Sequence, residues 1–140
     1  MATIIAVSNQ KGGVGKTTTT ANLGSALFQL GRRVLLVDMD PQANLTSAFG
    51  LSGQSEHSIA DCLLDRKVRP PVFNVGEDSS GRLDLIPSSI TLASTEAALM
   101  NKLGRELRLR DQLSAMSGQY DYVIIDTPPS LGLLTINALV

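Results

Sequence analysis

The 140-residue sequence is poor in cysteine and in aromatic residues. It contains one cysteine, Cys62, no tryptophan and only 4% aromatic residues. A single cysteine excludes a disulfide within the chain and cannot by itself form a structural zinc or iron–sulfur site. We therefore interpret Cys62 as a small buried residue.

Long apolar runs and an excess of one charge are also missing. Runs such as residues 4–7 and 34–37 are far shorter than the roughly 18 to 20 residues of a membrane span, and the N-terminus lacks the pattern of a signal peptide. We expect a soluble, cytoplasmic protein with no stable membrane association. The 12 Lys and Arg residues against 13 Asp and Glu leave a net charge of −1, so attraction to nucleic acid has to come from local patches.

Apolar residues are abundant enough to build a folded core. They make up 43% of the chain, and the mean hydropathy is +0.12, which argues against intrinsic disorder. Residues 131–140 stay apolar and helix-like to the last position, without a cap or a polar tail. We expect residues 1–140 to be the N-terminal part of a single domain, truncated at its C-terminus.

Short apolar stretches alternate with helical patterns along the chain. A stripe of leucines before Gly31 predicts a first helix with a left-handed cap, and residues 41–53 and 70–81 are predicted as polar or surface segments. Further helices are expected within residues 58–67 and 90–116. The predicted strands are residues 3–8, 33–38, 83–86 and 122–126. This order predicts an α/β fold with a doubly wound, mostly parallel sheet flanked by helices.

The most specific feature is a glycine-rich loop between the first strand and the first helix. Glycines let backbone N–H groups approach phosphate oxygens closely, and the N-terminus of the following helix adds its positive dipole end. The expected phosphate-binding residues are Lys11, Gly12, Gly13, Val14, Gly15, Lys16, Thr17 and Thr18. This loop makes the predicted fold that of a P-loop NTPase.

Two residues of the loop have specific expected roles. Lys16 would reach the β- and γ-phosphates as a point charge, and the Thr17 hydroxyl would bind Mg²⁺. The standard pattern requires glycine six residues before the lysine, and Gln10 stands there. The loop is therefore a variant of the usual one.

Two other interpretations of the loop fit the sequence less well. A tight turn without a ligand does not account for the succession of glycine, lysine and threonine. A dinucleotide fingerprint would use Gly13, Gly15 and a ribose-binding Asp38, but its third glycine is replaced by Thr18. Phosphate binding is the better interpretation.

Three carboxylates follow predicted strands that neighbour the loop. Asp126 ends one strand and is expected to hold Mg²⁺ or its water, as a Walker B residue does. Asp38 could support a metal-bound water, and Asp40 could orient or activate the attacking water. Turn or cap formation before Pro41 is the structural alternative for Asp38 and Asp40.

Taken together, these motifs resemble the ParA-type partitioning ATPases of the Soj kind. The resemblance rests on residues 9–18, 38–42 and 126–130, and it covers essentially the whole chain. It implies a deviant Walker A loop in which Lys11 reaches the nucleotide of the other subunit of an ATP-sandwiched dimer. It also implies that Asp40 is the switch aspartate associated with hydrolysis, and that Asp126 begins the Walker B and switch II segment.

Other proteins share this type of loop. Nitrogenase iron proteins need more cysteines for their cluster than this sequence has, and residues 40–44 fit partitioning proteins better than division-site MinD proteins. A MinD-like membrane-associated ATPase, or a nucleotide-binding fragment without hydrolysis, stays as an alternative.

The resemblance implies a cycle of DNA segregation. Mg²⁺ and ATP would drive an ATP-dependent homodimer that binds nonspecific DNA on the nucleoid, and a ParB-type centromere-binding protein would stimulate weak hydrolysis. About half of a typical family member is absent, including the adenine-contacting segment and the basic residues expected to bind DNA.

Overall fold

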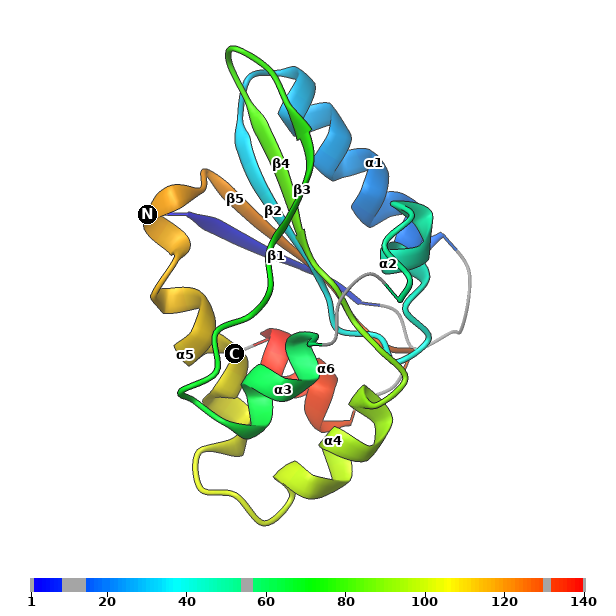
Figure 1. The fold of residues 1–140 in the computed structure, drawn as a ribbon, viewed down its shortest axis with the longest axis vertical. Helices are drawn as coiled ribbons and strands as arrows, with labels where there is room; N and C mark the ends of the chain where they lie inside the picture. Colours follow the sequence, from blue (N-terminus) through cyan, green and yellow to red (C-terminus); the bar gives the residue numbers. More distant parts are fainter. Residues whose placement is uncertain (1, 9–14, 54–56, 130–131, 140) are drawn as a thin grey trace.

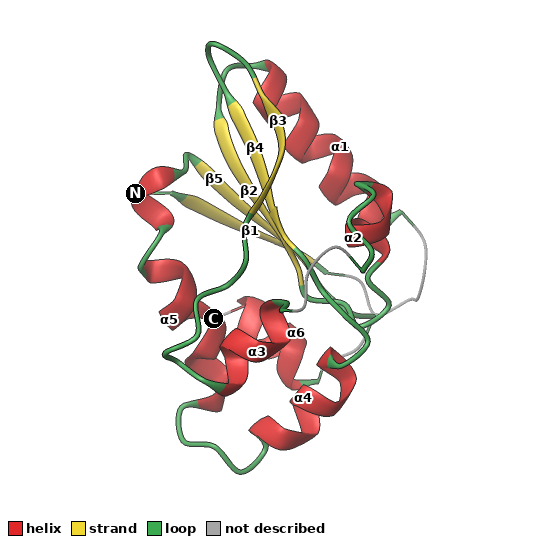
Figure 2. Ribbon diagram, viewed as in Figure 1, coloured by secondary structure: helices red, strands yellow, loops and turns green. Residues whose placement is uncertain are grey.

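The structure, a computed structural model, contains a five-stranded sheet with helices on both faces (Figures 1 and 2). It describes residues 2–8, 15–53, 57–129 and 132–139. The strand order is β1-β5-β2-β4-β3. The strands are β1 (Thr3–Val7), β2 (Arg33–Asp38), β3 (Phe73–Glu77), β4 (Arg82–Ile86) and β5 (Tyr122–Asp126).

The sheet is parallel except at one edge. β1, β5, β2 and β4 run in the same direction, whereas β3 pairs antiparallel with β4. β1 lies at the other edge and pairs with β5 alone among the described strands. The predicted α/β fold with a mostly parallel sheet is confirmed.

The central strands are buried on both faces because their side chains alternate between two cores. In β2, Leu35 and Val37 belong to one apolar cluster, and Val34 and Leu36 belong to the other. Helix α1 (Lys16–Gln29) covers the second cluster. The first cluster is covered by α3 (Ile59–Leu64), α4 (Leu92–Leu99), α5 (Arg108–Ser114) and α6 (Leu133–Leu139).

The first helix ends as its sequence predicts. Gly31 adopts φ +83°, its N–H donates to the carbonyl of Phe28, and the N–H of Arg32 donates to the carbonyl of Leu27. These two bonds form a Schellman motif, which satisfies the last carbonyls of the helix. The chain therefore leaves α1 in a fixed direction and enters β2 two residues after Gly31.

The two segments predicted as polar or surface segments contain short elements that the sequence did not indicate. Strand β3 lies within residues 70–81, where a bulge between Asn74 and Gly76 interrupts the alternation that would have marked it. Asp78 then accepts hydrogen bonds from the N–H groups of Ser80 and Gly81 and closes the turn into β4. Helix α2 (Asn44–Ala48) occupies part of residues 41–53.

The remaining helical predictions are confirmed. Helix α3 begins with a capping box between Ser58 and Asp61. Gly104, at φ +65°, separates α4 from a short 3₁₀ turn and α5 within residues 90–116. Cys62 is fully buried in α3, as expected. None of the described helices has the length and apolar character needed to cross a membrane.

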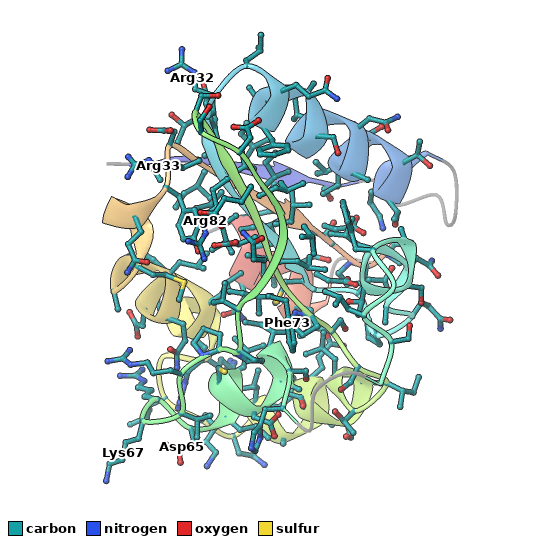
Figure 3. All side chains as sticks on the ribbon, turned by 45° about the horizontal axis from the view of Figure 1, so that its top comes forward. Arg32, Arg33, Asp65, Lys67, Phe73 and Arg82 are labelled. Carbon is teal, nitrogen blue, oxygen red and sulfur yellow. The ribbon has the colours of Figure 1, made fainter. Side chains whose placement is uncertain are left out.

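Ion pairs occupy the amino-terminal end of the parallel strands. Arg33 and Arg82, neighbours in register on β2 and β4, lie close together in Figure 3. Arg33 pairs with Asp121 at 3.3 Å, and Arg82 pairs with Asp84 at 2.8 Å. The predicted carboxylates Asp38 and Asp126 lie at the opposite, carboxyl-terminal end of these strands.

Candidate functional site

The carboxyl ends of three strands meet beside the start of α1. Asp126 is the register partner of both Val7 in β1 and Asp38 in β2. α1 begins at Lys16, directly after Gly15, which adopts φ +73°. The sheet therefore brings the start of α1 and the predicted carboxylates to one place, as parallel α/β folds do with ligand sites.

A cavity of about 180 Å³ opens between the start of α1 and the loop after β2. It is lined by Gly15, Lys16, Thr17, Thr18, Asp40, Gln42, Asn44 and Pro129. The other predicted loop residues, Lys11, Gly12, Gly13 and Val14, lie outside the described residues. Gln42, Asn44 and Pro129 lie within residues 38–44 and 126–130, which support the family resemblance, but none of them was predicted as a site residue.

Lys16 contacts two of the predicted carboxylates. Its Nζ lies 3.6 Å from Oδ2 of Asp40 and 3.5 Å from Oδ1 of Asp126. The three side chains are 6%, 5% and 0% exposed, respectively. One buried ammonium group thus faces two buried carboxylates.

Asp126 also joins the sheet to the second residue of α1. The Thr17 hydroxyl donates a 2.8 Å hydrogen bond to Oδ2 of Asp126, whereas Oδ1 accepts no hydrogen bond from the described residues. Burial raises the pKa of Asp126, and Thr17 and Lys16 act against that rise. A hydroxyl and a carboxylate oxygen side by side are ligands that suit Mg²⁺.

Asp38 has different surroundings from Asp126. Its Oδ1 accepts from the N–H of Asp40, and its Oδ2 accepts from both the N–H and the hydroxyl of Thr46. Burial raises the pKa of Asp38 to about 6, although these hydrogen bonds lower it. Asp38 therefore makes the turn contact weighed as its structural alternative, and it also anchors the N-terminus of α2.

Asp40 is held at three of its atoms. Its Oδ1 accepts from the N–H of Gln42, its Oδ2 faces Lys16, and its carbonyl accepts a 2.6 Å hydrogen bond from the Ser88 hydroxyl. The N–H of Ser88 in turn donates to the Thr46 hydroxyl. Thr46 and Ser88 thus support both aspartates, although their spacing in the sequence gave no signal of it.

These groups together fit a polyphosphate and a divalent cation. The N-cap of the 14-residue α1 makes no side-chain capping bond within the described part of the chain, and the first N–H groups and the positive dipole end of an α-helix suit an anion. Across the described ranges, no three His, Cys, Asp or Glu side chains gather to hold a metal by themselves. Mg²⁺ in such sites takes one or two carboxylates together with phosphate oxygens, which is the set that Asp126 and Thr17 would complete.

Comparison with known proteins identifies relatives over the whole chain. The sequence profile of a family described as an AAA domain matches residues 2–140. The sporulation initiation inhibitor protein Soj of Bacillus subtilis is 50% identical over 140 residues, covering 99% of this chain and 54% of Soj. The chromosome partitioning protein ParA of Myxococcus xanthus is 47% identical over 138 residues, covering 97% of this chain and 48% of ParA.

A solved structure has the same fold. The cobyrinic acid a,c-diamide synthase of Mycobacterium smegmatis, crystallised with a bound ATP analogue and magnesium, superposes with a TM-score of 0.90 at 45% identity. The match covers 99% of this chain and 56% of the synthase. The chain spans about half the length of the curated relatives it matches.

Proposed function

This chain belongs to the AAA-domain family, among the Soj- and ParA-type partitioning ATPases. We propose that it binds Mg-ATP and hydrolyses it slowly, and that this hydrolysis drives DNA segregation. The observation that carries the proposal is the convergence of Lys16, Thr17, Asp40 and Asp126 at the start of α1. The Mycobacterium smegmatis structure supports the nucleotide and the metal, whereas the partitioning role rests on Soj and ParA.

Each residue has a distinct part in the proposed chemistry. The first amides of α1 and the Lys16 ammonium would bind the β- and γ-phosphates. Bound Mg²⁺ would neutralise charge on these phosphates, held there by Thr17 and Asp126. Asp40, fixed by Gln42 and Ser88, would orient or activate the attacking water, and Asp38 would support a metal-bound water.

The proposed cycle uses nucleotide binding as a switch. In the ATP-bound state two copies would face each other, with Lys11 of each reaching the other nucleotide, because a second cation offsets the charge of two opposed triphosphates. The dimer would bind nonspecific DNA, and a ParB-type protein would stimulate hydrolysis and release. The protein would then work in the cytoplasm, on the nucleoid.

Calorimetric titration of the chain with ATP, with and without Mg²⁺, tests the nucleotide site directly. We expect Mg²⁺-dependent binding that Lys16→Ala abolishes and that Lys102→Ala, which removes an exposed lysine, leaves intact. Equal binding by the parent and Lys16→Ala would contradict the proposal.

Two further assays separate the alternatives. Phosphate release at concentrations that allow dimerisation distinguishes an ATPase from a nucleotide-binding protein that does not hydrolyse. Cosedimentation of the full-length protein with DNA or with liposomes, in the presence of ATP, distinguishes a partitioning protein from a MinD-like one.

A further inference from the structure

Lys16 contacts the carboxylate oxygen that the proposed metal ion would need as a ligand. Its ammonium lies 3.5 Å from Oδ1 of Asp126, the carboxylate oxygen that accepts no hydrogen bond from the described residues. The same ammonium lies 3.6 Å from Oδ2 of Asp40. In this arrangement Lys16 satisfies the two carboxylates that the proposed chemistry assigns to metal and water.

The Lys16 ammonium group cannot keep its contacts with both carboxylates while it also contacts a phosphate. A divalent cation bound to Oδ1 of Asp126 would lie within a few ångströms of the Lys16 ammonium, at a site where both groups are buried. Like charges repel strongly in such surroundings, because little water is present to screen them. Lys16 and a metal ion are therefore competitors for Asp126.

We infer that Lys16 alternates between two positions, one bridging Asp40 and Asp126 and one on phosphate, so that a divalent cation gains Asp126 only when phosphate draws Lys16 away. The inference rests on the proposed function, since it concerns the same site. It adds a rule of assembly: phosphate and metal enter the site together, and the metal alone is excluded by the protein's own lysine.

The burial of Asp126 explains why this lysine matters. An ionised carboxylate that is buried without a partner is strongly destabilising, and the Asp126 side chain is fully buried. Removing Lys16 would leave Asp126 and Asp40 facing each other without a cation, with the Thr17 hydroxyl beside them. Such a set of hard oxygen atoms would attract a divalent cation.

The test uses Mn²⁺ alone as the probe, detected by electron paramagnetic resonance, in the absence of nucleotide. We expect Lys16→Met to bind Mn²⁺ at least tenfold more tightly than the parent does. Lys102→Met removes the same charge from an exposed position and should bind Mn²⁺ like the parent. The gain should vanish in Lys16→Met combined with Asp126→Asn, which removes the carboxylate charge.

Two results would overturn the inference. One is equal Mn²⁺ affinity in the parent and in folded Lys16→Met, and the other is a gain that persists after Asp126→Asn. If Lys16→Met is unstable without metal, Mn²⁺ should raise its melting temperature more than that of the parent, and the absence of such a rise counts equally against the inference. Because no nucleotide is present, this result is independent of whether the ATP titration succeeds.

Discussion

Thr17 and Asp126 lie 109 residues apart in the sequence and are joined by a 2.8 Å hydrogen bond. The bond connects the start of α1 to the carboxyl end of β5. It therefore orders the two groups proposed to hold Mg²⁺ by linking them to each other. A hydrogen bond to a charged group contributes about 1.5–3 kcal/mol, which makes the link measurable.

Thr17→Ala should lower the free energy of unfolding by about 1–2 kcal/mol, because the Asp126 carboxylate loses its hydroxyl donor while helix propensity improves slightly. Urea denaturation measures the change. Thr19→Ala makes the same substitution at an exposed position of the same helix and should be neutral or slightly stabilising. Equal stability of the two variants would mean that the hydrogen bond contributes nothing.

The raised pKa of Asp38 predicts that stability depends on pH with a sign opposite to that of a carboxyl group whose pKa is lowered. Its pKa is about 6 in the folded protein against 3.8 ordinarily, so the folded state binds the proton more tightly than the unfolded chain does. The Asp38 contribution to stability is then fully present below pH 4 and is lost as the pH rises through 6, by up to about 3 kcal/mol. The measurement is the difference in unfolding free energy between the parent and Asp38→Asn, from pH 4 to pH 7.

Asp121 provides a comparison of opposite sign. Hydrogen bonds from the N–H and side chain of Arg33 lower its pKa, so its contribution is present above pH 4 and is lost on acidification. The difference between the parent and Asp121→Asn should therefore grow as the pH rises to about 4 and then stay level up to pH 7, while the difference for Asp38→Asn shrinks between pH 4 and pH 7. A difference for Asp38→Asn that stays level or grows between pH 4 and pH 7 would contradict the assignment of Asp38.

Asp40→Ala should separate binding from turnover. Phosphate release should fall by at least about a hundredfold if Asp40 orients or activates water. ATP binding should be retained or tightened, because Lys16 loses one of its two carboxylate partners, and the ATP dimer should accumulate. Calorimetry, phosphate release and light scattering measure the three effects, and unchanged turnover would exclude the catalytic role.

Lys11→Ala should spare most ATP binding and abolish the nucleotide-dependent dimer, if Lys11 acts across the interface. Size-exclusion chromatography with light scattering, with ATP and with ADP, measures the dimer. Lys67→Ala, which removes an exposed lysine far along the chain, serves as the control. Dimerisation of Lys11→Ala as strong as that of the parent would show that the proposed trans role is wrong.

The sequence predicted those parts of the fold that short-range pattern determines. Strands β2 and β5 are continuous apolar runs ending in Asp38 and Asp126, and Gly31 marks the end of α1 through its backbone conformation. The sequence did not predict strand β3, because this segment forms a strand by pairing with β4 across a bulge. Its only apolar side chains are Phe73 and Val75, and Gly76 follows directly, so the alternation is too short to mark a strand.

The sequence indicated which residues form the candidate site, but it did not indicate the hydrogen bonds that hold them. The motifs indicated Lys16, Thr17, Asp40 and Asp126, and the parallel register brings them together. The surroundings of Asp38 depend on Thr46 and, through it, on Ser88, 42 residues further along the chain. Only the packing of β4 beside β2 places that serine there, so no local pattern reveals it.

The position of β1 at the edge of the sheet gives this chain a second way to form a dimer with another copy. Its outer edge carries backbone N–H and C=O groups that no described strand pairs, and Ile4 on it is 50% exposed. Such an edge can pair with the same edge of another copy. That contact would be insensitive to nucleotide, whereas the proposed ATP dimer would dissociate when nucleotide is removed. Nucleotide removal therefore distinguishes the two kinds of dimer, since dilution dissociates both.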